Sequence, residues 1–146
     1  MVIDLRELRR KGKQEQSFHF EYQTERELST LPDVKVDMPI KVNGVVSLIG
    51  ERSAYVDLEI EFTLVGNCNR CLENTTKTYL VSLTEECDEQ SQTLKLNGDR
   101  IFLDSAVEDT VIINLPLIFL CKEDCKGICF GCGANLNNQQ CKCKNE

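Results

Sequence analysis

Cysteines dominate the chemistry that this 146-residue sequence can offer. Six of its nine cysteines fall within residues 121–143, and two more form a C-x-x-C pair at residues 68–71. Thiols at such spacing can form disulfides, carry out redox chemistry or bind a metal ion. Disulfides are disfavoured, because the number of cysteines is odd and close neighbours such as Cys141 and Cys143 cannot bridge without strain.

A structural zinc site is the favoured interpretation of the C-terminal cysteines. Zinc takes four thiolates in a tetrahedron, usually offered as two close pairs. Cys129 and Cys132 form a C-F-G-C-G knuckle, whose glycines tolerate the turn that directs both sulfurs to one ion. Cys141 and Cys143 supply a second pair after a loop of eight residues. We predict that these four cysteines bind one zinc ion.

The remaining cysteines can form a second zinc site. Cys68 and Cys71, together with Cys121 and Cys125, make two further pairs, which would join the start of the tail to a β-hairpin. This requires residues about 50 apart in sequence to meet. Alternatively, Cys121 and Cys125 join the tail site by exchanging partners. Cys87, in the acidic run EECDE, is most simply a spare thiol whose neighbours disfavour the thiolate. The predicted cofactor is therefore one or two zinc ions.

Redox chemistry is the alternative to structural zinc. Reactive C-x-x-C pairs usually open a helix, whereas the pair at residues 68–71 lies between two β-patterned segments. Cys125, Cys129 and Cys132 have the C-x3-C-x2-C spacing of four-iron clusters in radical enzymes, but those enzymes need a large barrel. The only histidine, His19, alternates within an aromatic strand, where it is a structural residue. We predict a protein that is not an enzyme, with a thiol-disulfide or iron–sulfur protein as the alternative.

Alternating apolar residues predict the strands that must position these thiols. The alternation is visible at residues 18–22, from residue 34 onward, at 56–64 and at 79–83. Around residues 40–48 the apolar residues keep one parity, although Asn43-Gly44 also suits a tight hairpin turn. Residues 56–64 have one apolar and one acid-rich face, as in an antiparallel sheet with one side in water.

Two short helices complete the predicted fold. Asp4 and Glu7 suit a helix start near the N-terminus, and Ser105 with Glu108 fits a capping box for a helix that Pro116 ends. Val107, Val111 and Leu115 in that segment lie at helical spacing. We expect an α+β domain at residues 1–120, mainly antiparallel β-sheet with one or two short helices. A zinc-ordered C-terminal tail at 121–146 packs on it.

Charge and hydropathy limit the partners. The formal charge is −7, and two four-thiolate zinc sites would bring it to about −11, so overall electrostatics do not favour nucleic acid. RNA contact would have to be local or come through a protein partner. The basic face of Arg6, Arg9, Arg10 and Lys13 is a candidate for such contact, although a solvated helix face is the favoured interpretation. No apolar run approaches the length of a membrane span, and the charged N-terminus does not suit a signal peptide. We expect a cytoplasmic protein with reduced thiols, no membrane partner and no small-molecule substrate.

Several of these segments together resemble the YceD family, bacterial and plastid proteins linked to the accumulation of large-subunit ribosomal RNA. The resemblance rests on NCNRCLE at 67–73, LPL at 115–117, the cysteines of 121–133 and NLN at 135–137, with IDLREL at 3–8 also similar. Phe130 stands where many relatives have proline.

The resemblance implies a non-enzymatic factor in ribosome biogenesis. Its partner would be a ribosome assembly intermediate, a ribosomal protein or an RNA-processing protein. Between two anchored cysteines, Arg70 is the candidate contact residue; alternatively, it pairs with nearby carboxylates.

Overall fold

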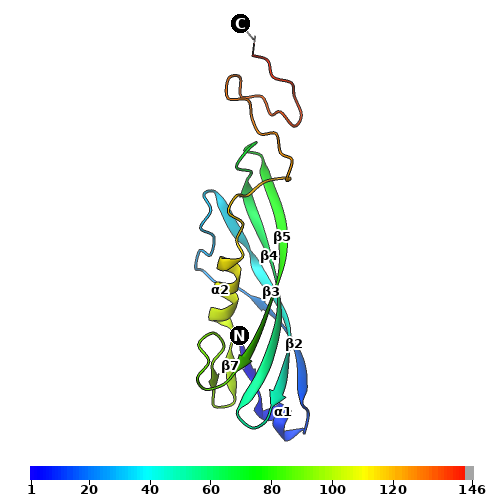
Figure 1. Cartoon of the computed structure of the whole chain (residues 1–146), viewed down its shortest axis with the longest axis vertical. Helices are drawn as coiled ribbons and strands as arrows, with labels where there is room; N and C mark the ends of the chain where they lie inside the picture. Colours follow the sequence, from blue (N-terminus) through cyan, green and yellow to red (C-terminus); the bar gives the residue numbers. More distant parts are fainter. Residues whose placement is uncertain (144–146) are drawn as a thin grey trace.

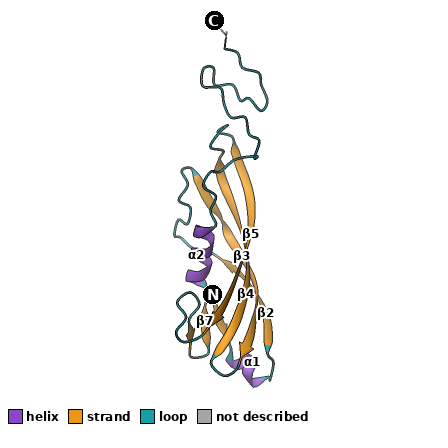
Figure 2. Ribbon diagram, viewed as in Figure 1, coloured by secondary structure: helices purple, strands orange, loops and turns teal. Residues whose placement is uncertain are grey.

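A long four-stranded antiparallel sheet forms the body of the molecule. The computed structural model describes residues 1–143. The sheet has the order β2-β3-β4-β5, and its strands are β2 (Glu15–Tyr22), β3 (Val34–Ile49), β4 (Ser53–Asn67) and β5 (Asn74–Cys87). Figures 1 and 2 show an elongated molecule in which the C-terminal tail continues beyond the end of the sheet where β4 and β5 are joined.

The alternation in the sequence explains the sheet. Every second residue of β4 from Ala54 to Leu64 is buried, and the intervening residues are exposed or half-buried. This is the pattern of a strand with one face on a core and one in water. The predicted strands at 18–22, 56–64 and 79–83 are confirmed as parts of β2, β4 and β5, and each observed strand is longer than the apolar pattern that predicted it.

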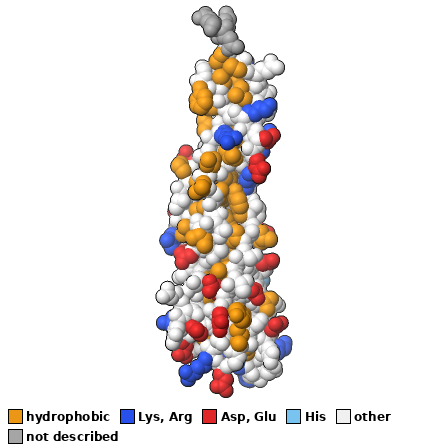
Figure 3. Space-filling model, viewed as in Figure 1, with side chains coloured by type: hydrophobic (Ala, Val, Ile, Leu, Met, Phe, Trp, Pro, Cys, Tyr) orange, Lys and Arg blue, Asp and Glu red, His pale blue; other side chains and the backbone are white. Residues whose placement is uncertain are grey.

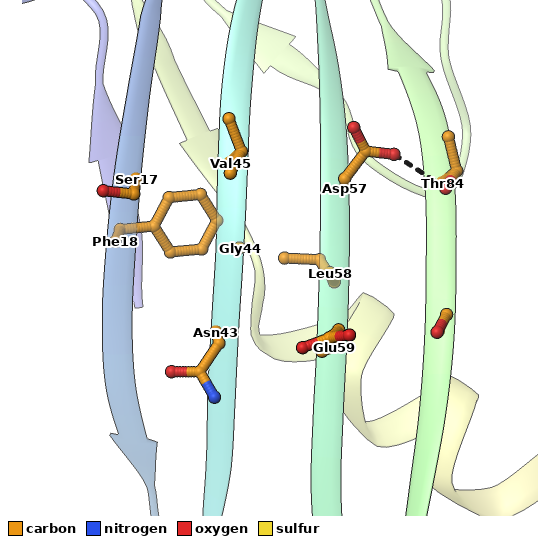
Figure 4. A pocket seen from close by; sticks show the side chains of 10 residues that line it. Ser17, Phe18, Asn43, Gly44, Val45, Asp57, Leu58, Glu59 and Thr84 are labelled. Carbon is orange, nitrogen blue, oxygen red and sulfur yellow. Dashed lines mark hydrogen bonds between the residues drawn. The ribbon is translucent and has the colours of Figure 1, made fainter.

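The strand β3 runs straight through Asn43-Gly44, so the alternative of a hairpin turn there is wrong. Gly44 lies opposite Phe18 of β2 and Leu58 of β4. A Cβ atom at Gly44 would come within 2.5 Å of the Phe18 ring and of the Asp57 carbonyl oxygen. Figure 4 shows a pocket on this part of the sheet, lined by Gly44 and Phe18 among other residues. At its edge the hydroxyl of Thr84 donates to Asp57 at 2.7 Å. The glycine is therefore required by packing and not by a turn.

A small second sheet was not predicted. Its three strands, β1 (Val2–Asp4), β6 (Leu96–Asn97) and β7 (Arg100–Phe102), pair antiparallel in the order β1-β7-β6. Strands of two or three residues are too short to show an alternating pattern. Between β1 and β2 lies the predicted short helix, α1 (Arg6–Arg10), and the Glu7–Lys11 ion pair of that segment measures 3.4 Å.

The second helix, α2 (Asp104–Ile113), confirms the predicted helix but not its capping box. The residue before the helix is Leu103, and it makes no side-chain cap; Ser105 lies inside the helix. The carboxylate of Glu108 instead accepts hydrogen bonds from the Tyr22 hydroxyl at 2.6 Å and from Arg26 at 2.8 Å. A tertiary contact to β2 has thus replaced the local one.

The end of α2 agrees with the position of Pro116. The helix ends at Ile113, and Leu115 lies beyond it, in line with the bias of the residue before proline toward extended backbone. Val107 and Val111 are fully buried. Their burial fixes α2 against the sheet (Figure 2).

One core holds the sheets and helices together, and it does not extend into the tail. It contains fully buried Phe62, Ile60 and Leu64 from β4 and Phe119 from the segment after α2. Beyond residue 120, the buried residues of the described tail are Cys125, Gly127 and Ala134. Tail residues therefore depend on something other than apolar burial for their order. No helix within residues 1–143 is long and apolar enough to cross a membrane.

Candidate metal centres

The inner cluster joins the sheet to the tail. It consists of Cys68 and Cys71 at the β4–β5 turn and Cys121 and Cys125 from the tail, with all four sulfurs within 4.8 Å of one another. The Cys68–Cys125 sulfurs are 3.8 Å apart and the Cys71–Cys121 sulfurs 3.6 Å apart. Three of the four residues are buried. The predicted meeting of residues about 50 apart in sequence is confirmed.

The outer cluster lies entirely in the tail. Cys129, Cys132, Cys141 and Cys143 again place all four sulfurs within 4.8 Å of one another. The sulfur of Cys129 is 3.3 Å from that of Cys141 and 3.6 Å from that of Cys143. The two groups of four are those predicted, so the alternative in which Cys121 and Cys125 join the tail site is wrong. None of the nine cysteines forms a disulfide.

The same local backbone carries the first pair of each cluster. The N–H of Cys68 donates to the carbonyl of Glu73 and the N–H of Leu72 donates to that of Cys68, both at 2.9 Å. In the outer cluster, the Cys129 N–H donates to Ala134 and the Gly133 N–H to Cys129, at 2.9 and 2.8 Å. Leu72 and Gly133 occupy the equivalent position and have positive φ, +62° and +70°. Both turns are thus knuckles, and only the outer one has the glycine that this backbone favours.

Backbone N–H groups favour charge on one thiol of the inner cluster. Burial alone would raise the pKa of Cys68, but the backbone N–H groups of Cys71, Cys121 and Arg70 outweigh it and lower the pKa to about 6. Burial raises the pKa of Cys121 to about 12, with further increases from neighbouring sulfurs. A negative charge on one sulfur thus disfavours ionisation of the neighbouring thiols, and a bound cation would allow all four to ionise.

The outer cluster has the same electrostatic pattern with less burial. Backbone N–H groups of Cys132 and Gly131 lower the pKa of Cys129 to about 6. The thiols of Cys141, Cys129 and Cys132 raise the pKa of Cys143 to about 12. The chemistry of both donor sets therefore suits a soft metal cation held by thiolates.

The side chain of Arg70 contacts the tail and not a carboxylate. Its guanidinium donates to the carbonyl of Cys125 at 3.1 Å, and its own carbonyl accepts from the N–H of Ile128 at 3.1 Å. The ion pairs of the described residues do not include it, so the alternative of a carboxylate partner is wrong. Arg70 therefore joins the Cys68–Cys71 turn to the tail through hydrogen bonds. Its role as a contact residue for a partner stays a prediction.

Asparagines around the inner cluster were not predicted as site residues. The side-chain N–H of Asn137 donates to the sulfur of Cys125 at 3.4 Å, and its Oδ1 accepts from the N–H of Lys126 at 3.0 Å. Asn69 exchanges two hydrogen bonds of 2.8 Å with the backbone of Phe119. Both asparagines lie close to cysteines in sequence. Asparagine is common in loops, however, because its side chain bonds to nearby backbone, so the sequence alone does not reveal these contacts.

A third asparagine links the two knuckles. Asn135 donates to the carboxylate of Glu73 at 2.8 Å and lies opposite Ile128 in an isolated antiparallel bridge. Only three residues separate Cys125 of the inner cluster from Cys129 of the outer one. The two candidate metal centres therefore share one short, hydrogen-bonded segment of chain.

The predicted basic face lies at the other end of the molecule, on α1 (Figure 1). Arg6 pairs with Asp4, Arg9 with Asp99 at 3.3 Å, and Arg10 with Glu7 at 3.7 Å. Lys13, just after the helix, is exposed. In Figure 3 acidic and basic side chains are intermixed over this end. These carboxylates offset the positive charge of the face, and its RNA contact stays a prediction.

Two further residues agree with their predicted structural roles. The Nδ1 atom of His19 lies 2.6 Å from the amide oxygen of Asn43 across the β2–β3 pair. Cys87 is fully buried in the main core, away from both clusters. Burial, followed by its acidic neighbours, raises the pKa of this thiol to about 12.

The division into a domain at 1–120 and a tail at 121–146 stays a prediction, and residues 144–146 of that tail lie outside the described part of the chain.

Comparison with known proteins connects these features to a family. A family profile described as "Large ribosomal RNA subunit accumulation protein YceD" matches residues 56–146. Uncharacterised proteins of Mycobacterium tuberculosis (strain H37Rv) and Mycobacterium bovis are each 31% identical over 85 residues, 51% of this chain and 41% of theirs. The chain therefore matches about two-fifths of the length of these relatives. No solved structure matches the chain.

A plant protein provides a named relative. The Arabidopsis thaliana protein called large ribosomal RNA subunit accumulation protein YCED homolog 1, chloroplastic, is 40% identical over 40 residues, 27% of this chain and 12% of its own length. The family match covers well over half of the chain and contains all eight cysteines of the two clusters. The chain belongs to the YceD family.

Proposed function

We propose that each cluster holds one zinc ion and that the chain is a non-enzymatic factor supporting the accumulation of large-subunit ribosomal RNA. The family description and the name of the plant relative support the link to large-subunit ribosomal RNA. Two four-thiol clusters support the metal. The proposed place of action is the cytoplasm, where thiols are kept reduced.

The distances between sulfurs carry the proposal of zinc. Zinc–sulfur bonds of about 2.3 Å in a tetrahedron place neighbouring sulfurs about 3.8 Å apart. The inner pairs at 3.8 and 3.6 Å match this spacing, and the outer pairs at 3.3 and 3.6 Å lie slightly inside it. Backbone N–H groups also point at sulfur, as from Lys142 to Cys132 at 3.4 Å. Such hydrogen bonds stabilise thiolate over thiol.

The same geometry argues against a multi-iron cluster. Four sulfurs within 4.8 Å of one another leave room for one ion, whereas a cluster of several irons must separate its thiolates further. The C-x3-C-x2-C trio that suggested such a cluster is divided, with Cys125 in the inner group and Cys129 and Cys132 in the outer. A structural metal is therefore favoured over a redox cluster.

The proposed docking surface is a groove between the two knuckles. It is lined by apolar Leu72, Ile128 and Phe130 and by the cations Arg70 and Lys126, and none of the residues 1–143 adds a carboxylate to its lining. The side chain of Phe130 is fully exposed, and Leu72 is 60% exposed. Exposed aromatic and cationic side chains are typical of binding surfaces. The proposed partner is a ribosome assembly intermediate, a ribosomal protein or an RNA-processing protein, and any RNA contact here is local.

Metal analysis tests the first half of the proposal. Protein purified under reducing conditions should be colourless and contain about two zinc ions per chain. Cys71→Ser and Cys132→Ser variants should each lose about one of them. Brown protein containing iron and sulfide would refute structural zinc, and so would reduced protein with no bound metal.

Complementation tests the second half. Cells lacking this chain should accumulate less large-subunit than small-subunit ribosomal RNA, and the wild-type gene should restore the ratio. A Phe130→Ser variant should fail to restore it while keeping its zinc. Phe102→Ser, a matched change of an exposed phenylalanine on β7, should restore it. An unchanged RNA ratio in the deleted cells would overturn the proposed function.

A pull-down from lysate identifies the partner class. Capture of ribosomal material that survives RNase indicates a protein contact, and loss after RNase indicates RNA. Retention of non-ribosomal proteins alone would count against the link to ribosome assembly.

A further inference from the structure

The outer edge of β5 is a long, regular and unpaired strand edge. Within residues 1–143, β5 pairs on one side with β4, and no strand pairs with its other side. The β4–β5 register runs unbroken from Asn67 opposite Asn74 to Ala54 opposite Cys87. Figures 1 and 2 show β5 along the border of the upper part of the sheet. Such an edge presents N–H and C=O groups to another strand, and natural proteins usually block it.

Two of the usual protective devices, proline and a β-bulge, are missing from this strand. Residues 74–87 contain no proline, and no bulge interrupts them. By contrast, β3 carries Pro39 and an irregularity between Asp37 and Lys41. The apolar residues of β5 remain partly uncovered, since Tyr79, Val81 and Leu83 are half-buried and Leu80 is 64% exposed. This edge would bury more apolar surface if another strand lay beside it.

Two charges of opposite sign lie on the core-facing side of β5. Lys77 lies opposite Leu64 and Glu85 opposite Val56, both buried residues of β4. No ion pair of the described residues includes either charge. Eight residues of strand place them about 27 Å apart, too far to pair within one chain. A single inward charge is a known block to edge pairing, but this pair is placed symmetrically about Val81.

We propose that two copies of this chain pair through antiparallel β5 edges, with Val81 on the two-fold axis. In this register Lys77 of each copy lies opposite Glu85 of the other, so two ion pairs form across the interface. Tyr79 lies opposite Leu83 and Thr78 opposite Thr84. Directly opposite side chains in such a pair have Cβ atoms about 4.5–5.5 Å apart, within reach of an ion pair.

Strand length is compatible with this register, and the charges select it over its neighbours. Pairing centred on Val81 brings residues 75–87 of the two copies together, nearly the whole of β5. Moving the centre to Leu80 or Ser82 places Lys77 opposite Leu83 or Cys87 and loses both ion pairs. A slip of the pairing by one residue would place odd-numbered opposite even-numbered residues, so the core-facing sides of the two copies would lie on opposite faces of the joined sheet. The charges, the faces and the overlap therefore agree, and the pairing does not depend on the proposed function.

Charge reversal on the full metal-loaded chain tests the pairing. Sedimentation velocity should show wild-type protein as a dimer of the 16.6-kDa chain. Lys77→Glu and Glu85→Lys each place like charges opposite one another and should raise the dimer dissociation constant by about 10- to 100-fold. Mixed together, these two variants should dimerise again, because one then contributes two glutamates and the other two lysines. The double variant should also dimerise.

Matched controls separate this register from other causes. Lys95→Glu makes the same charge change at an exposed position outside β5 and should leave the dimer intact. Circular dichroism should show that each single variant is folded. A wild-type monomer at the highest soluble concentration would overturn the proposal. So would a Lys77→Glu variant that dimerises as well as wild type, or a mixture of folded variants that stays monomeric.

Discussion

The hydrogen bond from Asn137 to the inner cluster can be tested by removing the side chain. In an Asn137→Ala variant, the sulfur of Cys125 loses its 3.4 Å donor and the N–H of Lys126 loses its 3.0 Å acceptor. A hydrogen bond to a charged group contributes about 1.5–3 kcal/mol. This corresponds to about 10- to 100-fold in affinity, the range found when a group that hydrogen-bonds to a metal ligand is removed. We expect the inner cluster to bind zinc more weakly by that factor.

Competition with a chelator measures this effect. A background of Cys141→Ser and Cys143→Ser removes two outer ligands, so that the retained zinc reports on the inner cluster alone. Asn138→Ala is the matched control, because this neighbouring asparagine is exposed and its backbone alone bonds, to Asn135. Its affinity should equal that of the background protein. Equal affinities for the Asn137 and Asn138 variants would refute the reasoning.

Three further predictions concern the backbone, the sheet and pH. Gly133→Ala should weaken the outer cluster by about 1 kcal/mol in chelator competition, because φ is +70° although the space for a methyl is open; unchanged zinc retention would contradict this. Gly44→Ala should lower the free energy of urea unfolding by about 1–3 kcal/mol, because the new Cβ would meet the fixed carbonyl of Asp57; wild-type stability would show that the sheet yields there. The hydrogen bond from Tyr22, followed by that from Arg26, lowers the pKa of Glu108. This carboxylate therefore stabilises the fold above its ordinary pKa of about 4.3, and the contribution is lost as pH falls through the lowered value. Glu108→Gln should therefore lose less stability than wild type on acidification below about pH 4, and parallel pH profiles would argue against it.

The strands of the large sheet could be predicted because each buries alternate residues. The apolar series of β4 from Val56 to Leu64 is direct evidence of one buried face. At Gly44 the same parity continued through a dipeptide that also suits a turn. Local turn preference and the contact with Phe18 favoured different structures, and the packing prevailed.

The rest of the fold depends on contacts between distant residues. Glu108 matched a capping box in sequence, but Tyr22, 86 residues away, donates to it instead. The short strands of the second sheet have no periodicity to detect. Cysteine spacing correctly divided the two clusters, since close pairs are geometrically tied to one site, whereas Asn137 and Asn135 gave no comparable signal because their partners are set by the tail's path.

The three-residue link between Cys125 and Cys129 imposes a hierarchy on the tail. Once the inner centre is filled, residues 126–128 are held against Arg70, and the outer centre then has one ligand already near its final place. The inner centre needs less help from the outer one, because the buried Phe119, hydrogen-bonded to Asn69, already holds the start of the tail beside Cys68 and Cys71. Because Cys132, Cys141 and Cys143 are exposed, an ion held by the outer cluster would also be the easier one to remove. If each cluster holds zinc as proposed, scarcity of zinc would empty the outer cluster first, while the inner cluster keeps the tail attached to the sheet.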